Sequence, residues 1–345
     1  MKVIFIADLH LDSAFIGEDR IARNIELINN FKSVVDYAKS EGITSVLIGG
    51  DLFDTPTPSS ATTKAVSNIL EQNKDITFYA VCGNHDPLNT TAFYKTAPDN
   101  MVVFGDRISM VELDGTALYG VSVRENADRR NVFGGFLANP ESMFICHGDI
   151  ASDCGFDLVR ADVESSGISL LLMGHIHKTK EQQLSGPRVL HAGALHGRGF
   201  DECGQKGFYL VDTATKQYEF VPLNAKQYRE CVVDVSDCAD IADIAAKINA
   251  QPVAENEIVR AVLVGGISGD VYIETNEILK YCPAFFEIKD KTELSEDILL
   301  NANANTLEGE FIRLMLAKID AADSSEKNML NDALKQGVIA LRCQK

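Results

Sequence analysis

The stretch ITFYAVCGNHD, residues 76–86, decides the fold of this chain. Residues 76–82 form a mostly apolar, β-rich run that predicts a buried strand, and Gly83-Asn84-His85-Asp86 follows where that strand ends. Clustering an amide, an imidazole and a carboxylate at the end of a buried strand is costly unless a ligand binds there. We therefore predict that a pair of metal ions binds at this end of the strand.

The chain before this stretch repeats the same pattern twice. Strand-like runs at residues 2–7 and 44–48 are each followed by polar side chains, and apolar residues at helical spacing, at 20–40 and 60–72, separate the three runs. Asp8 and His10 follow the first run, and Asp51 follows the second. Open α/β sheets bind ligands at the carboxyl ends of their strands, so we expect these side chains to meet.

The chain after this stretch predicts a second sheet. Short runs at residues 101–104, 108–113 and 117–123 are typical of antiparallel strands. Runs at 143–146 and 169–173 end at His147 and at Gly174-His175-Ile176-His177, with a helix predicted at 156–165 between them. More strand-like runs follow at 188–192, 207–212 and 217–222. This order predicts an α/β fold of the layered α+β type, with two layers of sheet flanked by helices.

The character of the sequence changes near residue 226. No histidine follows, and a β-α-β rhythm appears at residues 231–235, 239–250 and 258–264, with helical patterns at 307–320 and 325–341 closing the chain. We therefore predict two domains, a larger one at residues 1–225 and a smaller α+β domain at 226–345.

The composition limits the kinds of molecule that the chain can bind without specificity. The formal net charge is −18, and the excess of acidic residues is spread over the chain, ten before residue 226 and eight after it. This acidity argues against sequence-blind adhesion to nucleic acid or to anionic membranes, which a basic stripe normally provides. The eight cysteines form no CxxC pair and no signal peptide precedes the first strand, so we expect reduced thiols, a cytoplasmic location and no membrane span.

Histidines accumulate at the predicted strand ends. Five of the seven lie there, together with Asp8, Asp51 and Asn84: His10, His85, His147, His175 and His177. Carboxylate, amide and imidazole ligands without thiolate suit manganese, iron or zinc, and one aspartate can bridge two ions about 3.5–4 Å apart. We expect Gly50, Gly83 and Gly174 to provide sharp turns beside the ions. His191 and His196 carry less weight, because each can be merely structural.

Five short motifs together resemble those of the calcineurin-like metallophosphoesterase superfamily. They are Asp8-Leu9-His10, Gly50-Asp51-Leu52-Phe53-Asp54, Gly83-Asn84-His85-Asp86, His147-Gly148 and Gly174-His175-Ile176-His177. The resemblance implies a two-sheet metallophosphoesterase sandwich in which one metal is held by Asp8, His10, Asp51 and His177. It implies that the other metal is held by Asp51, Asn84, His147 and His175, with Asp51 bridging the two.

The same resemblance implies the catalytic roles. His85 is the expected general acid, or a clamp on the transition-state oxygens, with Asp54 pairing to its imidazole. A carboxylate beside an imidazole fixes its orientation and keeps it protonated more easily, which suits proton donation to a leaving oxygen. A hydroxide that bridges the metals is the expected nucleophile, and Asp86 is expected to hold the loop.

Residues 190–207 (LHAGALHGRGFDECGQKG) and 7–13 also resemble the bacterial DNA repair exonucleases of the SbcD and YhaO type. That family implies a manganese-dependent nuclease, although Fe2+ or Zn2+ also suits the ligands. It implies DNA as the substrate, a C-terminal cap for substrate recognition and, in many members, an SMC-like coiled-coil ATPase partner. Arg198 and Lys206 are our candidates for contacts to substrate phosphate, and Lys178 and Lys180 are weaker ones; a solvated loop charge is the alternative for each.

Two other functions stay open from the sequence. A phosphodiesterase or phosphatase for a small molecule or phosphoprotein uses the same core and suits the acidic surface, but the protein-phosphatase pattern has arginine where this chain has Thr55. A non-catalytic metal-binding scaffold requires that a ligand or the acid be missing, and none is missing.

Overall fold

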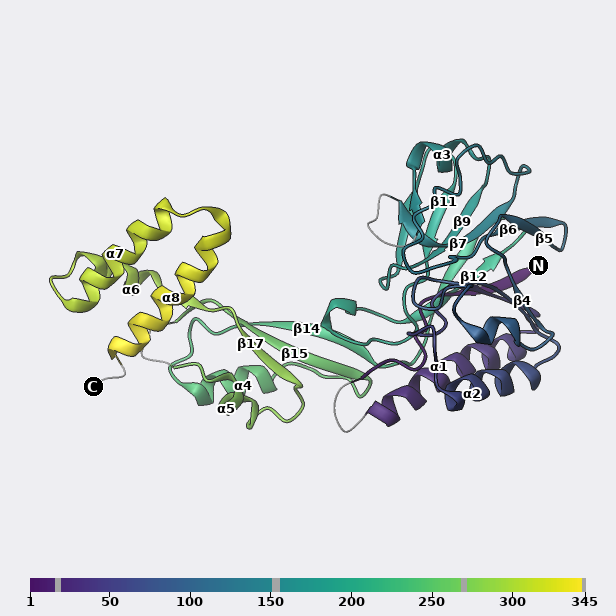
Figure 1. Cartoon of the computed structure of the whole chain (residues 1–345). Helices are drawn as coiled ribbons and strands as arrows, with labels where there is room; N and C mark the ends of the chain where they lie inside the picture. Colours follow the sequence, from purple (N-terminus) through teal and green to yellow (C-terminus); the bar gives the residue numbers. More distant parts are fainter. Residues whose placement is uncertain (16–19, 151–155, 268–271, 343–345) are drawn as a thin grey trace. The chain divides into compact units, whose positions relative to one another are not determined.

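A computed structural model describes residues 1–15, 20–150, 156–267 and 272–342 of the chain (Figure 1). The chain divides into two compact units, Met1–Gln227 and Tyr228–Lys345. The first unit carries all the predicted metal ligands.

The first unit contains a six-stranded sheet in the order β13-β12-β1-β2-β3-β4. The four strands from β1 to β4 are parallel, whereas β12 is antiparallel to β1 and β13 is antiparallel to β12. The bounds are β1 (Lys2–Ile6), β2 (Ser45–Gly49), β3 (Thr77–Val81), β4 (Met101–Val103), β12 (Gly207–Asp212) and β13 (Tyr218–Pro222). The antiparallel orientation expected for residues 101–104 is therefore wrong, because the chain crosses over and returns beside β3 in the same direction.

A second sheet has the order β10-β11-β9-β7-β6-β5, with β8 paired to β7. Its central strands are parallel and its two edge strands, β5 and β10, are antiparallel to their neighbours. The bounds are β5 (Ser109–Leu113), β6 (Thr116–Gly120), β7 (Met143–Ile150), β8 (Phe156–Leu158), β9 (Leu170–Gly174), β10 (Lys180–Gln183) and β11 (Arg188–His191). The helix expected at 156–165 is shorter than predicted: residues 156–158 form β8, and only α3 (Arg160–Ser165) is helical.

The first unit is layered because its strands are buried on both faces. On β1, Ile4 and Ile6 pack under α1 (Arg20–Ser40) and α2 (Ser60–Glu71), while Val3 and Phe5 face the second sheet. On the second sheet, Leu172 faces the first sheet and Leu171 packs in a separate cluster with Val163 of α3. The layers therefore run helix, sheet, sheet and helix with loop, which confirms the predicted fold class (Figure 1).

The second unit is a small α+β unit. A three-stranded sheet, β14-β15-β17, shares an apolar core with α4 and α5, and the helices α7 and α8 pack on each other around a separate core. The bounds are β14 (Gln227–Asp234), α4 (Ile241–Asn249), β15 (Glu257–Val264), β16 (Gly266–Ile267), α5 (Thr275–Leu279), β17 (Glu287–Asp290), β18 (Glu293–Leu294), α6 (Glu296–Leu300), α7 (Leu307–Ala321) and α8 (Ser324–Arg342). Among the described residues, no helix has both the length and the apolar character to cross a membrane.

The loops at the carboxyl ends of the strands carry unusual backbone angles. Asp8, His10, Asp12, Asp51 and His175 have positive φ, between 46° and 94°. Side chains other than glycine seldom adopt this region, and such strain persists only where the surroundings fix it. The carboxylate of Asp12 accepts hydrogen bonds from the Ser59 amide at 2.7 Å and the Thr62 hydroxyl at 2.9 Å, which fastens the first loop to the start of α2.

The glycines at this edge act mainly through close approach. Gly50 has a φ of +92° and makes the turn expected of it, but Gly83 and Gly174 do not have positive φ. A Cβ atom on Gly83 would lie 2.1 Å from Oδ1 of Asp51. The sharp turns expected at Gly83 and Gly174 are therefore wrong. Gly83 instead leaves room for a neighbouring carboxylate, and Gly174 leaves room for the Gly49 carbonyl oxygen, which would lie 2.1 Å from a Cβ atom there.

We predict that Gly83→Ala lowers the free energy of unfolding by about 1–3 kcal/mol, the usual cost of overpacking, because the Asp51 carboxylate must move. Gly105→Ala is the matched control, since its Cβ position has no neighbour within 4 Å, and its change should stay within about 0.5 kcal/mol. Calorimetric melting of the full chain with a chelator present measures both. Equal melting of the two variants would contradict the steric constraint.

Candidate metal centre

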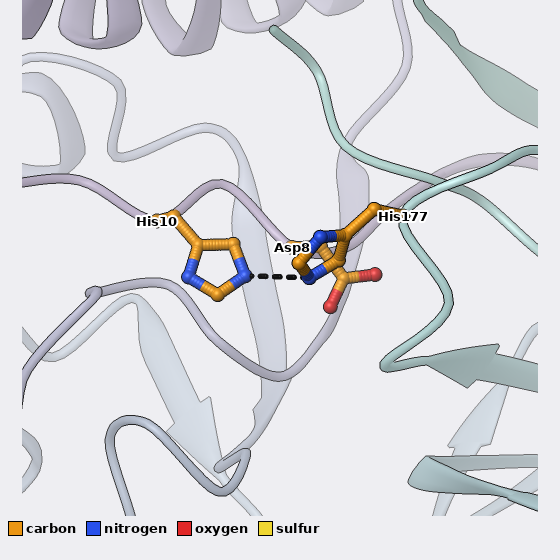
Figure 2. Close-up of side chains that lie close together, drawn as sticks. All are labelled: Asp8, His10 and His177. Atoms are coloured by element: carbon orange, nitrogen blue, oxygen red, sulfur yellow. Dashed lines mark hydrogen bonds between the residues drawn. The ribbon is translucent and has the colours of Figure 1, made fainter. Parts of the chain in front are cut away.

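Side chains from both sheets gather at the carboxyl ends of the strands. The loops after β1, β2 and β3 meet His147 of β7 and the residues after β9. Three sets of ligand atoms lie within 4.8 Å of one another: Asp8, His10 and His177 (Figure 2); Asp8, Asp51 and His147; and His10, Asp51 and His85. The structure thus brings the predicted motifs of both sheets to one place.

Two imidazoles of this cluster face each other closely. Nε2 of His10 lies 3.0 Å from Nε2 of His177 (Figure 2). The opposite nitrogen of each ring, Nδ1, lies 2.7 Å from a carboxylate oxygen, Asp54 Oδ1 behind His10 and Glu202 Oε1 behind His177. A carboxylate oxygen only accepts, so each Nδ1 carries a proton and donates it.

The two carboxylates are ionised. Burial raises the pKa of Asp54, but the His10 hydrogen bond and nearby cations outweigh burial and hold that pKa below its usual range. Burial also raises the pKa of Glu202, but His177 and Arg198 outweigh burial and lower that pKa to about 2. With both Nδ1 atoms protonated, the neutral rings present lone pairs at Nε2. A positive charge between them, a proton or a metal ion, is required for their 3.0 Å approach.

The other half of the cluster is also rich in acceptors. Nδ1 of His147 donates to the Gly49 carbonyl oxygen at 2.9 Å, so its Nε2 faces Asn84 Oδ1 at 3.0 Å and Asp51 Oδ2 at 3.2 Å. The same Asn84 oxygen lies 3.1 Å from Nδ1 of His175. Burial lowers the pKa of His147, but Asp51 and Asp8 outweigh burial and raise that pKa to about 9. The surroundings therefore favour positive charge at this point, which a metal ion provides when it displaces the proton.

Asp51 lies between the two halves. Its Oδ2 is 3.2 Å from His147 Nε2 and 3.6 Å from His10 Nε2, while its Oδ1 accepts the backbone N–H of His85 at 2.9 Å. Burial raises the pKa of Asp51, but the surrounding imidazoles lower it further than burial raises it. Asp8 is oriented similarly, because both of its oxygens accept the His175 amide, at 2.9 and 3.1 Å.

The contact between His85 and Asp54 differs from the expected pairing of an imidazole with a carboxylate. Nδ1 of His85 lies 3.1 Å from the backbone carbonyl oxygen of Asp54 and 3.7 Å from its carboxylate, whereas the carboxylate binds His10 at 2.7 Å. His85 therefore donates to the backbone carbonyl oxygen of Asp54, and the carboxylate of Asp54 serves His10. The His85 side chain is 42% exposed, whereas His10 and His147 are fully buried.

The residues predicted to contact substrate phosphate differ in burial and in their partners. Arg198 is held by two carboxylates, with Nη1 2.8 Å from Asp54 Oδ1 and Nη2 3.0 Å from Glu202 Oε1. Lys206 is buried, and burial lowers the pKa of its ammonium. Lys178 and Lys180 are exposed.

The two remaining histidines lie outside the three ligand sets. His191 and His196 are buried, and burial lowers the pKa of each to about 4.

Two acidic residues support the ligand loops from behind. Asp86 accepts the amide of Gly83 at 2.8 Å and that of Phe53 at 3.0 Å, so it holds its loop as the sequence analysis expects. Glu202 was not predicted as a site residue, although it lies in the run 190–207 and its carboxylate binds His177. The available signal was its position four residues after Arg198, a candidate phosphate contact.

The sequence that carries this centre is similar to those of known proteins. Residues 1–216 match the calcineurin-like phosphoesterase superfamily domain. The chain is 26% identical to the uncharacterized metallophosphoesterase YhaO of Bacillus subtilis, over 70% of this chain and 65% of that protein, so it spans just under two thirds of that relative. It is 25% identical to exonuclease subunit 1 of phage T4, over 66% and 70% of the two chains. It is 22% identical to the DNA double-strand break repair protein Mre11 of Sulfurisphaera tokodaii, over 97% and 93%.

These matches confirm the resemblance drawn from the five motifs. The superfamily uses divalent metals, and the convergence of lone-pair donors in this structure fits them. The chain belongs to the calcineurin-like phosphoesterase superfamily, and its relatives include proteins named as an exonuclease subunit and as a DNA double-strand break repair protein.

Proposed function

We propose that this protein is a two-metal phosphodiesterase that degrades DNA as an exonuclease. The observation that carries the proposal is one half-exposed imidazole, His85, beside a buried set of lone-pair donors. The names of two relatives, an exonuclease subunit and a DNA double-strand break repair protein, support DNA as the substrate.

The ligands divide into two sets around Asp51. Asp8, His10 and His177 would hold one ion with Asp51, and Asn84, His147 and His175 would hold the other with Asp51. The position of Asp51 Oδ2 between Nε2 of His147 and Nε2 of His10 supports its role as the shared ligand. When bound, two divalent ions neutralise charge on the phosphoryl oxygens and lower the pKa of coordinated water. Manganese fits this oxygen-and-imidazole donor set.

His85 would act on the substrate and not on the metals. Its Nδ1 donates to the Asp54 carbonyl oxygen, which fixes the ring and leaves the Nε2 end of a half-exposed side chain for the substrate. In the protonated ring, Nε2–H can donate to the oxygen that leaves phosphorus or to an oxygen of the transition state. The Asp54 carboxylate lies 3.7 Å from the same Nδ1.

The proposal extends to the location and the partners of the enzyme. We infer a cytoplasmic enzyme that works with an SMC-like coiled-coil ATPase; the word subunit in the phage relative's name supports only that a protein of this kind can belong to an assembly. Residues 226–345 would act as the substrate-recognition cap. Lys178, exposed directly after His177, is the proposed phosphate contact, since Lys206 is buried and Arg198 is engaged by two carboxylates.

We predict that His85→Ala and Asn84→Ala separate chemistry from metal binding. His85→Ala should keep two bound ions and lose about 10²–10⁴-fold in turnover, because only proton donation or transition-state contact is removed. Asn84→Ala should weaken the second ion, because its amide oxygen faces both His147 and His175. Elemental analysis after desalting, paired with turnover of bis-p-nitrophenyl phosphate, measures both effects. Loss of a metal in His85→Ala would contradict the assignment of His85 to the substrate.

We also predict that the manganese-loaded protein degrades labelled oligonucleotides from an end. A panel of single-stranded, blunt and recessed DNA, with His85→Ala as the inactive control, tests this directly. Cleavage of bis-p-nitrophenyl phosphate without cleavage of any oligonucleotide would end the nuclease proposal. It would instead favour the small-molecule phosphodiesterase that the acidic composition suits.

A further inference from the structure

We propose that Arg198, Glu202 and the Asp54 carboxylate form an orienting clamp that sets the affinity of one of the two metals and not of the other. Within this clamp Arg198 and Glu202 are positioning residues, because they act through His10 and His177. The inference rests on the proposed function for the assignment of His10 and His177 to the same ion.

The clamp is a continuous hydrogen-bonded chain. Glu202 is buried, and its Oε1 accepts the Nδ1–H of His177 at 2.7 Å while its Oε2 accepts the backbone amide of Arg198 at 3.0 Å. The Arg198 guanidinium then donates Nε–H and Nη2–H to Glu202 Oε1, at 3.1 and 3.0 Å, and Nη1–H to Asp54 Oδ1 at 2.8 Å. One guanidinium therefore holds both carboxylates that stand behind the facing imidazoles.

The geometry of Arg198 explains why an arginine suits this position. A planar guanidinium has five donors in a fixed fork, so it can serve two carboxylates at once, whereas an ammonium acts as a point charge. Both carboxylates bind ring Nδ1 atoms 2.7 Å away, and a small shift of either would rotate an imidazole and redirect its Nε2. The guanidinium also compensates the negative charge of two acids held close together.

The two metal sites differ in this support. His10 and His177 are both backed by carboxylates, which raise the basicity of the ligating nitrogen. His147, in the other set, is backed by the neutral carbonyl oxygen of Gly49. Nδ1 of His175 faces Asn84. Loss of the clamp should therefore weaken the ion at Asp8, His10 and His177 and spare the ion at His147.

The test is a manganese titration of the metal-free full-length chain, comparing wild type with Glu202→Gln, Glu202→Ala and Arg198→Lys. A matched control is Glu164→Gln, because Glu164 pairs with Arg160 at the same four-residue spacing and 3.0 Å, on α3 and outside the metal centre. Wild type and Glu164→Gln should bind two ions. Glu202→Gln should lose about 10–100-fold in affinity for one ion, as expected when a group behind a metal ligand is removed, and keep the other.

Two further readouts distinguish orientation from general damage. The electron paramagnetic resonance signal of a coupled manganese pair should give way to that of isolated Mn2+ in Glu202→Gln, and excess manganese should restore its turnover. Glu202→Gln retains the size of the side chain, so it carries the test where Glu202→Ala does not fold. Arg198→Lys should weaken the same ion by less.

The outcomes separate this inference from the proposed function. Binding of two ions with wild-type affinity by Glu202→Gln and Arg198→Lys would overturn the clamp while leaving the two-metal enzyme intact. Equal loss of both ions would overturn the asymmetry between the sites. If wild type itself binds no pair of ions, the proposed function fails before the clamp is tested.

Discussion

Lone-pair donors from two sheets point into one small volume, and their mutual repulsion is the constraint that the first unit is built around. Nε2 of His10 and Nε2 of His177 are 3.0 Å apart, and Nε2 of His147 is 3.2 Å from Asp51 Oδ2. Each contact needs a shared proton or a metal ion between the facing atoms, because acceptors without donors repel and are costly to bury. The fold must therefore hold these atoms in place from behind, and the centre must contain positive charge.

The support from behind takes three physical forms. Backbone amides fix the carboxylates, as the His85 amide does for Asp51. Proton acceptors fix the imidazoles, a carbonyl oxygen for His147 and carboxylates for His10 and His177. Hydrogen bonds also secure the strained loops, since Asp12 ties the first loop to α2. These groups keep the ligands aimed at a common point before any ion arrives, so less free energy is spent on ordering them when one binds.

Features set by neighbouring residues in the sequence could be predicted, and features set by residues far apart in the sequence could not. Buried parallel strands appear as apolar runs, so β1, β2, β3, β7 and β9 and the ligands after them were predictable. The polar edge strand β10 and the parallel pairing of β4 with β3 were not predictable, because pairing across a sheet decides them. Likewise, the Asp54 carboxylate binds His10, 44 residues away, and Glu202 binds His177, 25 residues away. Such partners are chosen by tertiary geometry, which no local pattern encodes.

The acidity of the chain and a polyanionic substrate are compatible once charge is considered locally. Four carboxylates stand in or directly behind the proposed centre: Asp8, Asp51, Asp54 and Glu202. Under the proposed function, two divalent ions and the Arg198 guanidinium would offset the negative charge of these carboxylates where a phosphodiester binds. Exposed charges farther from the centre than a Debye length of about 8 Å at physiological salt are largely screened. The net charge of −18 therefore weakens non-specific adhesion to DNA far more than it weakens binding of one phosphate at the metals.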